Sequence, residues 1–171
     1  LQRWRTAKFE SGQPESPTAW LPKDDEPALC GKVARLTSNM KAFTEEPRDV
    51  VILDEKGNPL LQGDNKRRFF EASWLHKYKE EYYFSYSTGD THLVCYATGD
   101  NPYGPFTYKG VILNPVVGWT SHHSIVEFKG KWYLFYHDSS LSKGVTHLRC
   151  IKMTELKYRG DGSIETIEPY R

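Results

Sequence analysis

One carboxylate in this sequence stands among aromatic residues where a loop leads into a predicted strand. Glu71 lies between Phe70 and Trp74. An apolar setting raises the pKa of a carboxyl group, which can then hold a proton near neutral pH and donate it as a general acid. The alternative is a solvated carboxylate that pairs with the nearby Arg67 or Arg68. Glu71 is therefore a candidate acid, with an ordinary ion pair as the other interpretation.

Two adjacent histidines, His122 and His123, begin a second strand-like segment. A histidine at such a position can bind a ligand or a metal-bound water. One histidine pair, however, is weak support for a metal. A hydrogen-bonded core histidine is the equally open alternative.

These candidates lie in two copies of one pattern. Residues 69–87 (FFEASWLHKYKEEYYFSYS) and 121–138 (SHHSIVEFKGKWYLFYHD) align at an offset of 50, and THLVC (91–95) aligns with THLRC (146–150) at an offset of 55. Repeats of about 40–50 residues built from short strands are typical of propeller blades. No segment has a convincing helical period. The sequence therefore predicts an all-β fold made of blades.

Each copy is expected to form a four-stranded antiparallel blade. The predicted strands are 73–78, 82–87, 91–97 and 106–113, then 124–128, 132–137, 146–153 and 164–167. Weaker strand signals at 1–9, 31–36 and 50–53 precede them, with a long Pro-rich loop at 10–29. We divide the chain into the end of a preceding blade (1–68), a blade with the candidate acid (69–118) and a last blade with the histidine pair (119–171).

Two further residues could contact a ligand. Arg149 stands where the first copy has Val94, and a guanidinium there could hold a hydroxyl or a carboxylate. Trp119 precedes the histidines and could stack on a sugar ring, or could pack over a blade. A surface arginine remains the alternative for Arg149. We assign no role to His92, His137 and His147.

Several motifs in the same order resemble glycoside hydrolase family 43. They are FEA-WL (70–75), YYFSYSTG (82–89), NPYGPF (101–106), TSHHSI (120–125), GKWYLFYHD (130–138), and R-C-I with DGSI near the end. The resemblance covers about residues 31–169. It implies a five-bladed propeller, of which this chain supplies about the last two and a half blades, and an enzyme that removes arabinofuranosyl or xylosyl units from xylan.

The resemblance also implies roles for individual residues. Glu71 falls on the general acid of an inverting glycosidase, and Phe70, Trp119, His122 and Arg149 are expected to contact the substrate. His122 matches a channel histidine found near a calcium ion and its waters, and a one-residue change of alignment would exchange it with His123. The catalytic base, an aspartate of the first blade, has no counterpart here, since Asp24, Asp25, Asp49 and Asp54 lie outside its motif.

A closed propeller needs at least about four blades. The chain begins at Leu1 rather than methionine, and we expect it to work with an N-terminal half that supplies the missing blades and the base. Alone it should hydrolyse nothing. The rival interpretations are a non-catalytic carbohydrate-binding propeller and a scaffold for protein partners.

Composition sets broader limits. The 171 residues include 23 basic and 22 acidic ones, so charge predicts neither nucleic acid nor an anionic membrane as a partner. No apolar run reaches the length of a membrane helix, and the first residues do not resemble a signal peptide. Three cysteines cannot all pair, and buried free thiols are preferred to a Cys95–Cys150 bridge. The compartment stays open, with an extracellular or periplasmic location slightly favoured and a cytoplasmic one as the alternative.

Overall fold

The structure, a computed structural model, describes residues 21–119 and 121–170. This part of the chain is built from strands, with no helix, which confirms the all-β prediction. No helix in it could therefore cross a membrane. The strands are β1 (Gly31–Val33), β2 (Arg48–Val50), β3 (Ile52–Leu53), β4 (Glu71–Tyr78), β5 (Glu81–Ser87), β6 (Val94–Gly99), β7 (Phe106–Leu113), β8 (His123–Phe128), β9 (Lys131–Asp138) and β10 (Cys150–Leu156).

The first large sheet has the order β3-β7-β6-β5-β4. Strands β4 to β7 form an antiparallel meander, as expected for the first blade, and the short β3 adds to β7 in parallel. Aromatic residues dominate β5, as is usual for strands in a sheet interior. The four strands predicted for this unit are confirmed, with shifts of a few residues at their ends.

The second sheet contains β10-β9-β8 and has three strands instead of the predicted four. The segment expected as its fourth strand, 164–167, leaves the sheet and returns to the first one. Ile164 forms a bridge with Tyr158, and Ile167 forms a parallel bridge with Leu113 at the end of β7. The backbone N–H of Ile167 donates to the carbonyl of Ile112 at 2.7 Å. This segment therefore ties the two sheets together.

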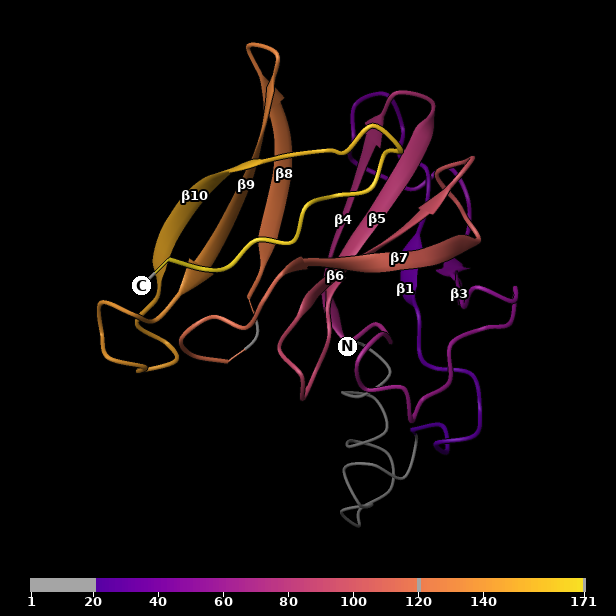
Figure 1. Cartoon of the computed structure of the whole chain (residues 1–171). Helices are drawn as coiled ribbons and strands as arrows, with labels where there is room; N and C mark the ends of the chain where they lie inside the picture. The colour runs from indigo at the N-terminus through magenta and orange to yellow at the C-terminus, as the bar shows by residue number, and fades with distance from the viewer. Residues whose placement is uncertain (1–20, 120, 171) are drawn as a thin grey trace.

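Figure 1 shows the two sheets side by side, with the β4–β5 and β8–β9 hairpins pointing to the same end. The first strands of the two sheets, β4 and β8, contact each other, as the innermost strands of neighbouring blades do. The yellow C-terminal segment crosses from the second sheet to the first near the hairpin end (Figure 1). The beginnings of β4 and β8 consequently lie together at the opposite end.

The apolar core has two parts. One lies between the two sheets and contains residues of both, among them Tyr83, Tyr96, Leu134 and Tyr136. The other covers the opposite face of the first sheet and includes Phe84, Tyr86 and Phe106. The first sheet is therefore buried on both faces. The β1–β2 pair lies beside it, with the Gly31 Cα so close to Ser73 that a Cβ there would approach the Ser73 hydroxyl to 3.2 Å.

All three cysteines are free, as preferred. Cys95 is buried, and Cys30 and Cys150 are half-buried. The expectation that Cys95 and Cys150 occupy equivalent positions is wrong by two residues. Cys95 pairs with Tyr86, and the matching Tyr136 pairs with Lys152, so Lys152 is the structural counterpart of Cys95. The strand signal at 1–9 lies outside the described residues, and the division of the chain at residues 69 and 119 stays a prediction.

Candidate active site

Glu71 is the first residue of β4 and lies opposite Ser87 of β5. The pairing of the two strands is irregular between Glu71 and Trp74, where β4 contains a bulge. Within it Ala72 has a φ of 62°, in the left-handed region that costs a residue with a side chain about 1–2 kcal/mol. Bulges re-aim the side chains next to them. The bulge therefore sets the direction in which Glu71 leaves the sheet.

His122 is the counterpart of Glu71 in the second sheet. Strand β8 pairs with β9 from His123 opposite Tyr136, and this register continued by one residue places His122 opposite His137. The His122 Nε2 lies 3.6 Å from the Glu71 Oε1. This distance exceeds that of a hydrogen bond, so the two side chains are close neighbours and not a hydrogen-bonded pair. The adjacent starts of two innermost strands thus bring a carboxylate and an imidazole together.

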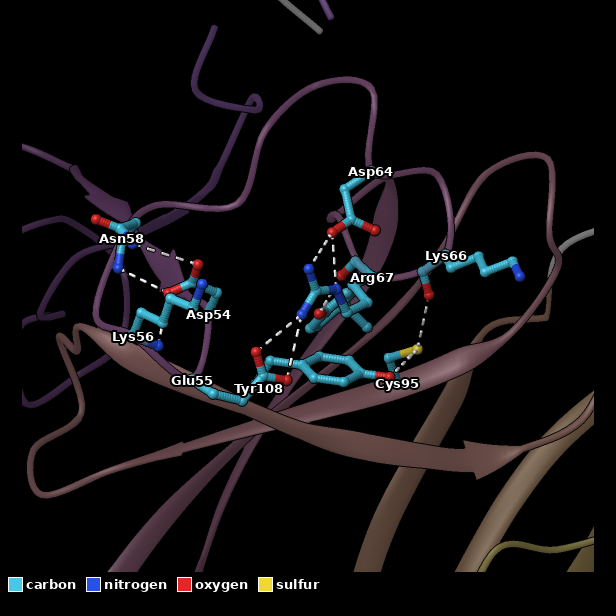
Figure 2. Close-up of polar contacts among 10 residues, drawn as sticks. Asp54, Glu55, Lys56, Asn58, Asp64, Lys66, Arg67, Cys95 and Tyr108 are labelled. Atoms are coloured by element: carbon cyan, nitrogen blue, oxygen red, sulfur yellow. Dashed lines mark hydrogen bonds and ion pairs between the residues drawn. The ribbon is translucent and has the colours of Figure 1, made fainter. Parts of the chain in front are cut away.

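The arginines named in the alternative interpretation of Glu71 have other partners. Figure 2 shows the Arg67 guanidinium turned toward Asp64 and Glu55, to which it forms ion pairs of 2.7 and 3.1 Å. Arg68 donates to the side chain of Asn65 at 3.2 Å. An ion pair of Glu71 with these arginines is therefore not the interaction that defines the site.

The other histidine of the pair, His123, has a different environment. Its Nε2 lies 2.7 Å from the Ser85 hydroxyl of the neighbouring sheet. Burial, together with the neighbouring His122 and His76, lowers the pKa of His123 to about 3, so the ring is neutral. His123 consequently joins the two sheets, as the core interpretation expected, while His122 faces Glu71.

His137, to which no role was assigned from the sequence, connects His122 to Arg149 in this site. Its Nε2 accepts a hydrogen bond from the backbone N–H of His122 at 3.0 Å. The Arg149 Nη1 lies 3.3 Å from the same atom. Burial, and then the charge of Arg149, lower the pKa of His137 and favour its neutral form. The only signal in the sequence was that the first copy has Ser87 at this position.

Arg149 is in the predicted neighbourhood but on a different kind of segment. It lies one residue before β10 instead of within the matched strand, and its side chain is exposed. Its Nε donates to the carbonyl of Thr146 at 3.0 Å, which fixes the guanidinium beside His137. Glu71, His122 and Arg149 are thus brought together, the last through His137.

The two aromatic candidates flank the turn that follows β5. Phe70 is 47% exposed, and its ring lies against Gly89, where a Cβ would approach it to 3.3 Å. Trp119 is 52% exposed and contacts the ring of His92 edge-on, with centroids 4.6 Å apart. Both therefore present apolar ring surface to solvent, and both are held by residues of the same turn.

The described residues do not by themselves fit a calcium ion. Within 21–119 and 121–170, no three His, Cys, Asp or Glu side chains are grouped so that they could hold a metal. Calcium needs six to eight oxygen ligands, and a histidine ring could take part only through water.

Comparison with known proteins identifies relatives of similar sequence. The chain is 65% identical, over 169 residues, to a xylosidase/arabinosidase of Bacteroides ovatus, covering 98% of this chain and 50% of that protein. A family 43 β-xylosidase/α-arabinofuranosidase from a compost metagenome, solved with xylotriose in a calcium-free form, is 62% identical with a TM-score of 0.90. The match covers 100% of this chain and 51% of the chain of the compost enzyme. No family model matches the sequence.

A family 43 enzyme of Xanthomonas citri is 58% identical with a TM-score of 0.88. That match covers 92% of this chain and 48% of the chain of the Xanthomonas enzyme. The chain thus spans about half the length of the relatives it matches. Its two curled sheets are blades of the same five-bladed propeller. The predicted resemblance is confirmed: the chain belongs to glycoside hydrolase family 43 and corresponds to the C-terminal part of its catalytic domain.

Proposed function

We propose that this chain supplies the general acid of an inverting glycoside hydrolase that removes arabinofuranosyl or xylosyl units from xylan-type polysaccharides. It acts together with an N-terminal half that carries the catalytic base. Relatives that match nearly the whole chain are named xylosidase/arabinosidase and β-xylosidase, and one of the solved ones holds xylotriose.

The observation that carries the proposal is the placement of Glu71. It stands at the start of an innermost strand, re-aimed by a bulge, with its carboxylate 3.6 Å from the imidazole of His122 on the next sheet. A carboxylic acid at this position can protonate the glycosidic oxygen as the bond to the leaving group breaks. His122 and Arg149 are positioned to bind the hydroxyls of the sugar or to orient the acid.

The second carboxylate of the reaction has to come from elsewhere. In an inverting enzyme it lies about 6.5–9.5 Å from the acid and activates water on the opposite face of the sugar. Two described aspartates of the N-terminal segment have structural partners: Asp49 forms an ion pair with Lys32, and Asp54 accepts hydrogen bonds from the backbone of Lys56 and Asn58 (Figure 2). Neither is arranged as a base opposite Glu71.

The outer face of the second sheet supports a partner of propeller shape. Alternating residues of its strands leave apolar side chains exposed, with Ile151 at 83%, Phe128 at 61% and Met153 at 50%. Met153 lies opposite Phe135, so the patch is continuous across neighbouring strands. Exposed apolar patches of this kind mark interaction sites. The missing blades of the same fold have the shape that would cover it.

The test is complementation. This chain replaces the matching half of the Bacteroides ovatus relative, and the product, called here the complemented enzyme, is assayed on xylo-oligosaccharides and on aryl glycosides with activated leaving groups. Glu71→Gln keeps the shape but cannot donate a proton. We expect a loss of about 10²–10⁴-fold in kcat on the oligosaccharides, with a much smaller loss on the activated substrates. Equal losses on both would show that Glu71 is not the acid.

A carbohydrate-binding propeller without catalysis is the second candidate, because Phe70 and Trp119 expose flat ring surfaces beside the site. Its expected outcome is binding of xylo-oligosaccharides that Glu71→Gln leaves unchanged, with no turnover by the complemented enzyme. As for calcium, the oxygen ligands that it requires would have to come from the missing half, and the proposed mechanism contains no step through it.

A further inference from the structure

One peptide unit in the site is held from both sheets at once. The carbonyl of Ser121 accepts a hydrogen bond from the Ser87 hydroxyl of β5. The N–H of His122, which belongs to the same peptide group, donates to the His137 Nε2 of β9 at 3.0 Å. Both polar atoms of this unit are therefore engaged by side chains, and its plane cannot rotate without breaking one of the two bonds.

The residues that hold the peptide occupy equivalent places in the two copies. Ser87 is opposite Glu71 on β5, and His137 is the residue 50 positions later on β9. The Ser121 hydroxyl strengthens the arrangement, since it donates to the His137 carbonyl at 2.8 Å and accepts from the His137 N–H at 3.3 Å. Ser87 and Ser121 are buried, where a lost hydrogen bond is costly.

His137 can serve in this way in one protonation state only. Its Nε2 receives two donors, the N–H of His122 and the guanidinium of Arg149. An Nε2 that carried a proton could accept neither of them. The ring must therefore be neutral with its proton on Nδ1. In that form one nitrogen atom links the backbone of His122 to the side chain of Arg149.

We propose that Ser87 and His137 form a clamp on the Ser121–His122 peptide and act as positioning residues for the site. The clamp holds the His122 ring against Glu71 and keeps the Arg149 guanidinium beside it. The ring planes of His122 and His137 lie nearly parallel, 22° apart with centroids at 5.9 Å, so the two rings are direct neighbours. The inference rests on the proposed function of Glu71 and adds the residues that orient its neighbour.

Two matched substitutions at one position test the clamp in the complemented enzyme. His137→Phe keeps a flat ring but removes the acceptor, and His137→Gln restores an acceptor atom near the place of Nε2. We expect His137→Phe to lower kcat on xylo-oligosaccharides by about 10–100-fold, as misplacement of a group by about 1 Å can do. KM and the rate on activated aryl glycosides should change little. His137→Gln should recover most of the loss.

A double-mutant cycle shows whether His137 acts through His122. If it does, His137→Phe has a much smaller effect in a His122→Ala background than in the unmodified enzyme. Fully additive losses would overturn the proposal, and so would equal activities of the Phe, Gln and unmodified forms. Ser87→Ala removes the other bond of the clamp and should reproduce the direction of the His137→Phe effect, with thermal unfolding as the control for folding.

The clamp and the proposed function can fail separately. If Glu71→Gln loses activity as expected and His137→Phe does not, the clamp is wrong while the acid assignment stands. If Glu71→Gln is fully active, the acid assignment is wrong. In that event, the ring-nitrogen NMR spectrum of His137 in the complemented enzyme still decides the clamp. A proton on Nδ1 with a bare Nε2 supports it, and a proton on Nε2 overturns it.

Discussion

The two sheets follow one plan but differ in how they are covered. In β5 the burial is continuous, with the residues from Tyr83 to Ser87 all buried, whereas in β9 it alternates, with Leu134, Tyr136 and Asp138 buried and the residues between them partly exposed. A strand packed on both faces gives the first pattern and a strand packed on one gives the second. One face of the second sheet therefore carries partly exposed side chains that nothing in the described chain covers.

The residues of the candidate site lie where the two copies differ in sequence. Glu71 is set apart by the bulge that β8 lacks, and Ser87 is replaced by His137. A third difference lies beside them, where the neutral Cys95 of the first sheet corresponds to Lys152 in the second. Matching residues preserve the blade, and the residues that break the match form the site and its supports.

The largest expected effect concerns two tyrosines at equivalent positions. Tyr83→Ala should destabilise the isolated chain by about 3–5 kcal/mol, because the ring is buried between the sheets and its hydroxyl donates to the Gly162 carbonyl at 2.7 Å. Tyr133→Ala, on the open face, should cost about 1 kcal/mol or less. Urea unfolding of both variants measures the difference. Equal losses would show that the outer face of the second sheet is already packed.

The next effect comes from a charged pair that the first sheet does not have. Asp138 and Lys152 form a nearly buried ion pair of 2.7 Å, and Cys150 donates to the other carboxylate oxygen at 2.9 Å. Asp138→Asn leaves the ammonium without its counter-charge and should cost about 3 kcal/mol. The double variant with Lys152→Met should be more stable than Asp138→Asn alone. If it is not, the pair does not govern the stability of this sheet.

The same carboxylate predicts a response to acid. Burial alone would raise the pKa of Asp138, but the hydrogen bonds from Cys150, Lys152 and Ser140 outweigh it and lower the pKa to about 2. In the unfolded chain the pKa of this carboxyl group is near 4, so its lower pKa in the folded chain stabilises the fold at any pH above about 4. This stabilisation, roughly 2 kcal/mol, disappears as the pH falls toward 2. Unfolding free energies measured from pH 5 to pH 2 should therefore fall less steeply in Asp138→Asn than in the unmodified chain.

The smallest effect is expected on the open face itself. Ile151→Thr replaces an exposed side chain near the start of β10 and should change the stability of the isolated chain by less than about 0.5 kcal/mol. In the complemented enzyme, where this face is predicted to be covered, the same substitution should lower the unfolding temperature. An unchanged melt there would argue against the predicted contact between the halves.

The blades could be predicted from the sequence because alternation and repetition are local signals. The pattern of alternating residues in Tyr82–Tyr86 recurs in 132–136, and the observed strand pairing has the same register in both sheets over this stretch. The alignment of the third strands was predicted wrongly because THLVC and THLRC have nearly the same letters. In the structure the two sheets align Cys95 with Lys152 and not with Cys150. His137 was missed because its partner is a backbone N–H. Which backbone donor meets which side chain depends on register between strands, and one sequence carries no pattern for that.

The bulge at Ala72 has a consequence for the phase of its strand. From Trp74 onward a residue and its counterpart are 50 positions apart, whereas Glu71 and His122 are 51 apart. The bulge absorbs this extra residue, because Glu71 and Trp74 still lie opposite Ser87 and Ser85, which are two residues apart on β5. Successive side chains of a strand point to opposite faces, so in a regular ladder of the same sequence Ala72 would stand opposite Ser87 and Glu71 would fall one place further along. The bulge therefore lets one additional residue enter the strand while the carboxylate keeps the place that His122 has in the next sheet.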